Sequence, residues 1–169
     1  MAIAEDIAAV ARQDKEIILP AFDNNTAWRI GNILRDLAGS RNQNIAADVR
    51  RFGSPHQQLF YSAMPGTTPD AQRWIARKVA TVARFHRCSY GVGLYLRQNN
   101  LAFGTRYNLP EEDYAAHGGC FPIIVANAGL IGAVTVSGLT QREDHNLAVE
   151  ALCIEGKLDH NSLRLDPVQ

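Results

Sequence analysis

The sequence predicts an α+β domain in which helices pack on an antiparallel sheet. Two apolar runs rich in β-branched residues, CFPIIVA and LIGAVTVSG, are joined by residues 127–129, which form a hairpin connection with glycine where a positive φ is wanted. Segments with helical periodicity stand before and after these runs, and hairpins combined with helices indicate this class. A length of 169 residues suits one domain spanning residues 1–169.

The first third of the chain predicts two helices and two clear strands. AIAEDIAAVA has apolar residues at helical spacing, and EIILP is a short strand candidate that ends at Pro20. FDNNTAWRIGNILRDLAGS is a helix with N-cap candidates at residues 23–25 and a stop at Gly39. NIAADVRRF and QQLFYSAM are strands separated by the turn GSPH.

The remainder predicts two longer helices on either side of the hairpin. One begins at TPD, capped by Thr68, and its period continues to about Cys88. Residues 89–116 leave two interpretations open: GVGLYLRQ fits a longer helix or a strand, and NLPEEDYAAH fits a loop with a short helix. The last helix begins at TQREDH, where Thr140 and Glu143 have the spacing of a capping box.

Composition excludes several functional classes. Seventeen basic and seventeen acidic residues cancel, which argues against a dedicated nucleic-acid binder and favours self-association over a monomer. No apolar run has the length of a membrane span, and the N-terminus lacks the basic region of a signal peptide, so we expect a cytoplasmic protein. Cys88, Cys120 and Cys153 form no CxxC pair, which fits reduced thiols.

Polar residues on apolar helix faces mark candidate sites. Lys78 and His86 fall within the apolar sector of the helix that begins at TPD. Lys78 either extends to solvent beside Trp74 or faces a ligand, and His86 is either a hydrogen-bonded core residue or a ligand contact. The opposite side of this helix is either a solvated face or, alternatively, an oligomer contact or an anion site. Four arginines share that side: Arg73, Arg77, Arg84 and Arg87.

The last helix has a similar conflict in its first turn. Asp144 projects onto the apolar face, where it either caps the helix or stands at the mouth of a pocket, and His145 lies beside it. If the sheet brings Lys78 and His117 to these two residues, the four form a polar cluster at a helix N-terminus. Helix N-termini and glycine-rich turns both bind anions.

The segment HGGCFPI combines reactive side chains with a permissive backbone. His117 and Cys120 have HxxC spacing, but no second pair completes a zinc site, so no metal is predicted. A nucleophilic Cys120 lacks an assigned base. The two glycines either shape the turn into the strand or leave backbone N–H groups and His117 facing a ligand.

Four motifs occur together and in order: PGTTPDAQRWIARK, HGGCFPI, GAVTVSGLTQREDH and LAVEAL. This combination resembles the heme-degrading-domain (GlcG-like) family, related to heme-binding protein S, and in particular its branch of short uncharacterised cytoplasmic proteins. AFDNNTAWRIGNILRDLA and IAADVRRFG fit the same branch. The resemblance extends from about Glu16 to Leu152.

The resemblance implies a profilin-like α+β fold, with an antiparallel sheet flanked by helices, in a homo-oligomer. The assembly would be a dimer or a larger ring of dimers. Heme is the cofactor that the family name implies, but no axial ligand carries over, because this chain reads HGGCFP where heme-associated relatives more often have a GGxP stretch without the histidine.

We therefore expect a cytosolic, oligomeric protein that binds a small, partly anionic ligand. The pocket would lie between the GG-F-P turn, the WIARK helix and the start of the C-terminal helix. One alternative is an enzyme of heme or small-molecule turnover that uses His117 or His145 as general acid or base. Another is an interaction scaffold without a small ligand. The candidate ligand-binding residues are Arg77, Lys78, His117, Gly118, Gly119, Ser137, Asp144 and His145.

Overall fold

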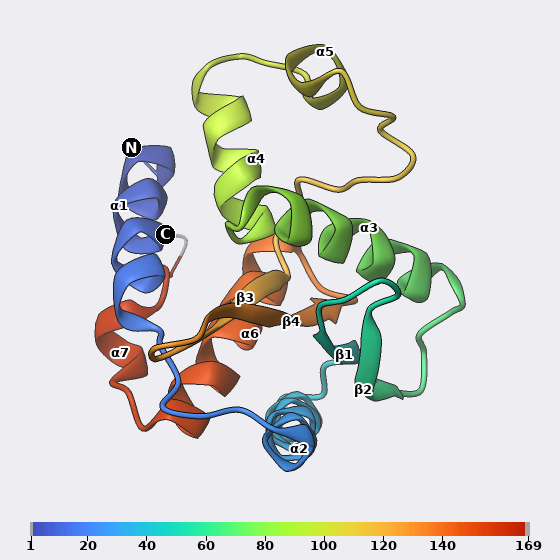
Figure 1. Cartoon of the computed structure of the whole chain (residues 1–169), viewed down its shortest axis with the longest axis vertical. Coiled ribbons are helices and arrows are strands. Elements are labelled where there is room, and N and C mark those ends of the chain that lie inside the picture. The colour runs from blue at the N-terminus through green and yellow to red at the C-terminus, as the bar shows by residue number, and fades with distance from the viewer. Residues whose placement is uncertain (1, 168–169) are drawn as a thin grey trace.

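The computed structural model describes residues 2–167, which form a four-stranded antiparallel sheet with helices on both faces (Figure 1). This arrangement confirms the predicted α+β class. The elements in chain order are α1 (Ala2–Glu16), α2 (Asn24–Ser40), β1 (Ala46–Arg51), β2 (Gln57–Ala63), α3 (Asp70–Phe85), α4 (Ser89–Gln98), α5 (Phe103–Tyr107), β3 (Cys120–Val125), β4 (Gly129–Ser137), α6 (Gln141–Gly156) and α7 (His160–Leu163).

The strand order β2-β1-β4-β3 brings several chain segments to one end of the sheet. Ala46, at the start of β1, pairs with Ala63 at the end of β2 and with Ser137 at the end of β4. Cys120, the first residue of β3, pairs with Thr135 of β4. The connections into α3, α6 and β3 therefore converge at this end.

The predicted hairpin and two predicted helix caps are confirmed. β3 and β4 pair antiparallel through a turn in which Asn127 and Gly129 have positive φ. The Asp23 side chain accepts from the Thr26 N–H at the start of α2. Thr140 caps α6 in a capping box. Each of these features depends on residues close in sequence, which is why the pattern reveals them.

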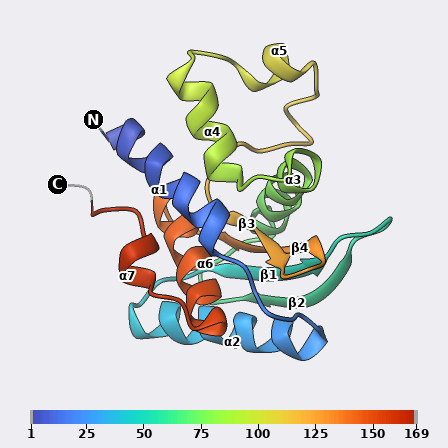
Figure 2. The same cartoon turned by 60° about the vertical axis from the view of Figure 1, so that its left-hand side comes forward.

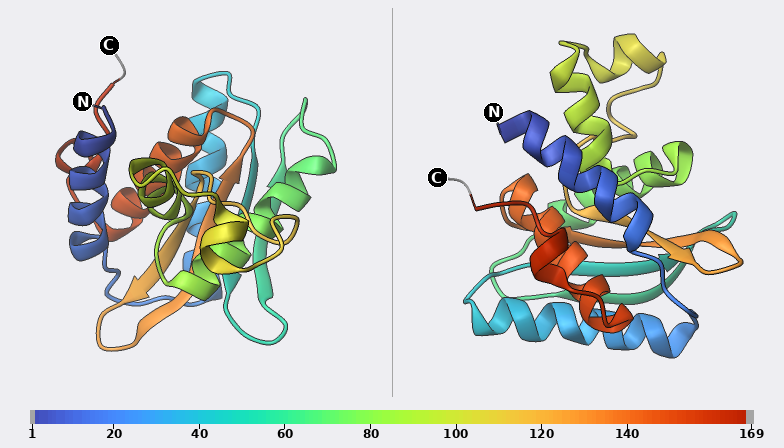
Figure 3. Two further views of the ribbon diagram at one scale, coloured as in Figure 1. Left: turned by 90° about the horizontal axis from the view of Figure 1, so that it is seen from above. Right: turned by 90° about the vertical axis from the view of Figure 1, so that its left-hand side faces the viewer.

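Helices cover both faces of the sheet (Figures 2 and 3), and an apolar layer lies between helices and sheet on each face. On one face, α2 and α6 bury residues such as Ile30, Leu34 and Leu152. On the other face, α3 buries Ile75 and Val79, among others. α3 packs mainly on β4 and β3, and its first turns line a pocket together with the end of β4.

The helix predicted from TPD to about Cys88 is α3, and it does not continue into GVGLYLRQ. α3 ends at Phe85, and His86 has left-handed backbone geometry, with a φ of 56°. The prediction that His86 is a core residue is wrong, because this reversal leaves its side chain exposed. α4 follows, and the Sγ of Cys88 accepts from the Gly91 N–H, so GVGLYLRQ is helical rather than a strand.

Three further features of the structure differ from the sequence prediction. EIILP forms only an isolated bridge between Leu19 and Val125. The short helix α5 precedes NLPEEDYAAH instead of lying within it. Thr68 does not cap α3, since the N-cap position is Pro69 and no side chain bonds there.

The two terminal helices lie together, although most of the chain separates them. α1 and α7 are side by side in Figures 1 and 3, and Gln13 Nε2 donates to the Leu163 carbonyl at 2.7 Å. α7 has no counterpart in the sequence prediction. Between residues 2 and 167, no helix has the length and hydropathy needed to cross a membrane.

Candidate functional site

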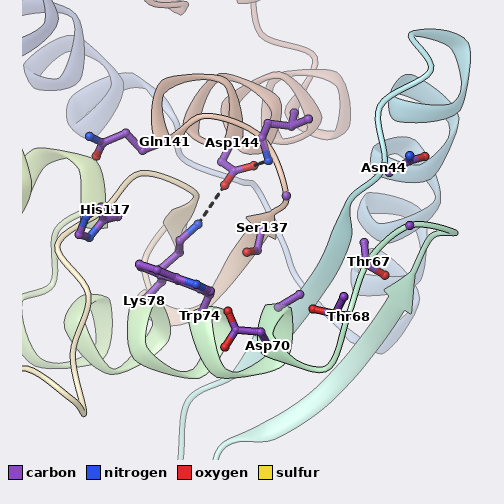
Figure 4. A pocket seen from close by; sticks show the side chains of 14 residues that line it. Asn44, Thr67, Thr68, Asp70, Trp74, Lys78, His117, Ser137, Gln141 and Asp144 are labelled. Carbon is purple, nitrogen blue, oxygen red and sulfur yellow. Dashed lines mark hydrogen bonds and ion pairs between the residues drawn. The ribbon is translucent and has the colours of Figure 1, made fainter.

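A pocket of about 370 Å³ opens at the convergent end of the sheet, between the N-terminal ends of α3 and α6 (Figure 4). We call it the central pocket. The β2–α3 connection and α3 form one wall, and the end of β4 with the first turn of α6 forms the other. Its principal side chains are those of Thr68, Asp70, Trp74, Lys78, Ser137 and Asp144.

A buried ion pair lies at the floor of the central pocket. Lys78 Nζ donates to Asp144 Oδ2 and to the Val136 carbonyl, each at 3.0 Å. The other carboxylate oxygen, Asp144 Oδ1, accepts from the Leu139 N–H at 3.0 Å. Lys78 and Asp144 are 3% and 2% exposed, so Lys78 faces inward rather than extending to solvent. Asp144 both anchors the start of α6 and borders the pocket.

Burial sets the protonation of this pair. It raises the pKa of Asp144 to about 6, although Lys78 and the nearby backbone N–H groups lower it. At neutral pH the carboxylate is therefore mainly ionised and balances the Lys78 ammonium. At mildly acidic pH it becomes protonated, and the charge of Lys78 is no longer neutralised within the pair.

Two donors at the floor have unused hydrogen-bonding capacity. Ser137 is 7% exposed, and its hydroxyl forms no hydrogen bond with residues 2–167; it is not one of their fully buried unpaired atoms, so it is reached from the pocket. Lys78 uses two of its three N–H bonds in the contacts described above. Both side chains line the pocket, so a ligand that enters it meets an unpaired hydroxyl and an ammonium.

The two glycines of HGGCFPI allow the close approach that this geometry needs. The Gly118 N–H donates to Gln141 Oε1 at 3.3 Å, and a Cβ at Gly118 would collide with the Gln141 carbonyl. Gly119 has a φ of 132°, and a Cβ there would collide with the Val136 carbonyl and lie 2.6 Å from Lys78 Nζ. The turn thus enters β3 and leaves room for the ion pair.

His117 stands at the rim of the pocket, next to an aromatic wall. Its ring lies edge-on to Trp74 with centroids 5.3 Å apart, and the guanidinium of Arg77 lies 4.8 Å from the centre of the Trp74 ring. Although much of the His117 side chain is exposed, partial burial lowers its pKa, and the charges of Lys78, Arg77 and Arg97 lower it further. The imidazole is therefore neutral at neutral pH.

The structure brings half of the eight predicted residues to the central pocket: Lys78, His117, Ser137 and Asp144. Gly118 and Gly119 lie behind its wall, and Arg77 lines an adjoining cavity.

His145 lies away from the central pocket. It is 0% exposed, and its Nε2 is 2.8 Å from Gln13 Oε1, on the side of α6 that faces α1. Burial lowers the pKa of His145 to about 3.

Several pocket residues were not among those predicted: Asn44, Gly66, Thr67, Thr68, Asp70, Ala71, Trp74, Gly138, Leu139 and Gln141. Many of them lie in PGTTPDAQRW, a motif that carries the family resemblance but no recognised chemistry of its own. The signal that could have found them is the concentration of small and hydroxyl residues directly before a helix N-terminus.

Cys120 does not line the central pocket, and its thiol is buried. Cys120 is 0% exposed, accepts from Thr135 Oγ1 at 3.1 Å, and burial raises its pKa to about 12. A thiolate nucleophile is therefore strongly disfavoured. Within the described part of the chain, no group of three or more histidine, cysteine, aspartate or glutamate side chains could hold a metal ion.

Comparison with known proteins identifies the family. Residues 22–153 match the sequence profile described as "Haem degrading protein HbpS-like". The chain belongs to the HbpS-like family. This HbpS-like protein is 50% identical over 165 residues to a UPF0303 protein of Acidobacterium capsulatum and 48% identical over 165 residues to one of Paraburkholderia phymatum. In both comparisons the alignment covers 98% of each chain.

Solved structures share the fold of this HbpS-like protein. The Ybr137w protein has a TM-score of 0.81 at 24% identity, with 89% of this chain and 88% of that chain covered. The PduOC:heme complex has a TM-score of 0.66 at 15% identity, covering 79% and 94%. HbpS has a TM-score of 0.62 at 16% identity, covering 79% and 88%. At these identities the likeness establishes the fold alone.

The central pocket of this HbpS-like protein does not fit heme. Its floor is an ion pair, and its walls carry hydroxyl, amide and carboxylate groups, with Trp74 as the one aromatic side chain. Apart from its two propionates, the porphyrin of heme would remove these polar groups from water without offering hydrogen bonds, which is costly. The exposed His117 is the one histidine at the rim, and its imidazole packs edge-on against Trp74.

Proposed function

We propose that this HbpS-like protein binds a small organic ligand with an anionic group in its central pocket. The unpaired hydroxyl of the nearly buried Ser137 is the observation that carries the proposal. Because the pocket leaves this hydroxyl accessible, an oxygen of a ligand can accept its hydrogen bond in place of water. The remaining N–H of Lys78 supplies a charge-assisted donor nearby.

The charges around the pocket support a ligand that is anionic only in part. Lys78 and Asp144 balance each other at neutral pH, and the N-terminal ends of α3 and α6 add partial positive charge. The exposed Asp70 lines the mouth of the pocket and introduces a negative charge. The ligand would place its anionic group at the floor and a hydrogen-bond donor toward Asp70.

The test uses benzoate and inorganic phosphate as probes, with Trp74 fluorescence as the signal. The chain has two tryptophans, and Trp28 is 62% exposed on α2, so a Trp28→Phe background leaves Trp74 as the sole indole. We expect Ser137→Ala to weaken binding of at least one probe about tenfold. The exposed Ser162 provides the matched control, Ser162→Ala.

A second variant tests the role of the ion pair in ligand binding without leaving a buried unpaired charge that would destabilise the fold. Lys78→Met combined with Asp144→Asn removes both charges together and leaves neither unpaired. We expect this double variant to fold and to lose probe binding. Unchanged affinity in both Ser137→Ala and the double variant, or no binding by wild-type protein, would contradict the proposal.

A hemin titration tests whether the protein binds heme, the compound that the family description names. A saturable, shifted Soret band that is lost in His117→Ala would replace the proposed ligand class with heme. Self-association stays a prediction as well, and sedimentation of the purified protein measures it directly.

A further inference from the structure

A second cavity of about 410 Å³ adjoins the central pocket. We call it the side cavity. It shares His117 and Gln141 with the central pocket, and Figure 4 shows both side chains together at one edge of that pocket. These two side chains therefore form the partition between the spaces. The side cavity also has Arg77, Gly93, Arg97 and Tyr114 in its wall.

Two arginines without carboxylate partners line the side cavity. Within residues 2–167, neither Arg77 nor Arg97 forms an ion pair. Arg77 Nη2 donates to the Glu111 carbonyl at 2.9 Å, and its Nε is buried without a hydrogen-bond partner. The guanidinium of Arg97 lies 5.4 Å from the centre of the Tyr90 ring. Arginines held by stacking are favourable partners for carboxylate or phosphate groups.

Glu111 is the acidic residue in the wall of the side cavity, and its carboxylate already accepts a hydrogen bond from the backbone. Glu111 Oε1 accepts from the Gly104 N–H at 3.1 Å, at the start of α5. The formal charge of the wall is positive, with Arg77 and Arg97 against Glu111. The central pocket has the opposite balance, because Asp70 and Asp144 stand against Lys78. The side cavity therefore offers a positive environment for an anionic group in addition to the donors at the floor of the central pocket.

We infer that the side cavity is a second anion subsite, so that the ligand is an elongated molecule with an anionic group at each end. One group would bind at Lys78 and Ser137, and the other at Arg77 and Arg97. The middle of the ligand would pass His117, which can donate or accept one hydrogen bond. This inference rests on the proposed function, because it extends the same ligand.

Paired dicarboxylates and monocarboxylates test the two subsites separately. Succinate, adipate and suberate are compared with butyrate, hexanoate and octanoate by calorimetry and by Trp74 fluorescence in the Trp28→Phe background. We expect at least one dicarboxylate to bind about tenfold tighter than its monocarboxylate counterpart, since a second charge-assisted contact contributes at this scale. Arg97→Gln should abolish that advantage and leave monocarboxylate affinity unchanged.

The control variant is Arg84→Gln, which removes an arginine that is also exposed but lines neither cavity. Arg97 is exposed, so its replacement should preserve the fold, which thermal unfolding checks. Inorganic phosphate, titrated into wild type, Arg97→Gln and the Lys78→Met/Asp144→Asn variant, reports which subsite holds a single anion.

The outcomes distinguish the two proposals. Monocarboxylate binding that needs Ser137, without any dicarboxylate advantage, would support the proposed function and overturn the second subsite. A dicarboxylate advantage that survives Arg97→Gln would also overturn it. Phosphate binding that is lost in Arg97→Gln but kept in Ser137→Ala would support the anion site in the side cavity and contradict the proposed floor of the central pocket. An absence of binding by every probe would reject both.

Discussion

The first turn of α6 contacts the central pocket on one side and α1 on the other, and the polar side chains on these two sides differ in how many hydrogen-bond partners they have. Asp144 and His145 are consecutive and both buried, but Asp144 faces Lys78 at the central pocket, and His145 faces Gln13 on α1. Burial disfavours the charged form of each: it raises the pKa of Asp144 to about 6 and lowers that of His145 to about 3.

The α1 side is almost saturated with hydrogen bonds. Asp6 accepts from the Tyr90 hydroxyl at 2.6 Å and from two nitrogens of Arg142 at 2.8 and 3.1 Å. Gln13 joins His145 to the Leu163 carbonyl. Only Nδ1 of His145 lacks a partner on this side, among the residues described. A saturated network holds elements together, whereas spare donors, as at Ser137, indicate a place for a ligand.

Breaking the Lys78–Asp144 pair from one side should have the largest effect on stability. Asp144→Ala leaves the ammonium of Lys78 buried and unpaired, which should lower the free energy of unfolding by about 3–5 kcal/mol. Urea unfolding followed by circular dichroism measures the change. Lys78→Met combined with Asp144→Leu should recover most of the loss, and failure to recover it would show that the pair contributes more than charge compensation.

Gly119→Ala should be the next most damaging change on the pocket side. The positive φ and the collision with the Val136 carbonyl and Lys78 Nζ should together cost more than about 2 kcal/mol. Gly39→Ala is the matched control, since Gly39 lies in α2 with open space around it. That change should stabilise the protein by about 0.5–1 kcal/mol. Equal effects of the two variants in thermal unfolding would contradict this account.

The opposite pKa shifts of Asp144 and His145 predict opposite slopes of stability against pH. The folded state of His145 resists protonation, so its contribution is fully present above pH 6.5 and is lost as the pH falls toward about 3. The folded state of Asp144 holds its proton more tightly than the unfolded chain, so stability decreases as the pH rises from 3.8 to about 6.

Single substitutions of His145 and Asp144 measure the contribution of each residue to the pH dependence of stability. His145→Asn should flatten the loss of stability on acidification, and Asp144→Asn should steepen it, in urea unfolding measured across this range. His86→Gln is the control, because that side chain is exposed. A His145→Asn profile that runs parallel to wild type would show that this histidine does not titrate as its burial implies.

Local patterns predicted more of the fold than of the site. The Thr140 capping box depends on residues within one turn, and Lys78 and Asp144 stood out as polar residues on apolar faces. The projection could not decide which packed side of α6 borders the pocket, because the helix packs against the sheet on one side and against other helices on others. That choice depends on the contact between His145 and Gln13, which are 132 residues apart.

The smallest expected effect comes from the α1 side and tests whether it is only structural. Asp6→Asn keeps the hydrogen bond from Tyr90 but removes the charge opposite Arg142, which should cost about 1–2 kcal/mol of stability. Benzoate affinity, measured by Trp74 fluorescence, should stay within about twofold of wild type, since a change of that size is under 0.5 kcal/mol. A larger loss of affinity would mean that Arg142 transmits the state of α1 to its neighbour Gln141, and through it to the partition between the two cavities.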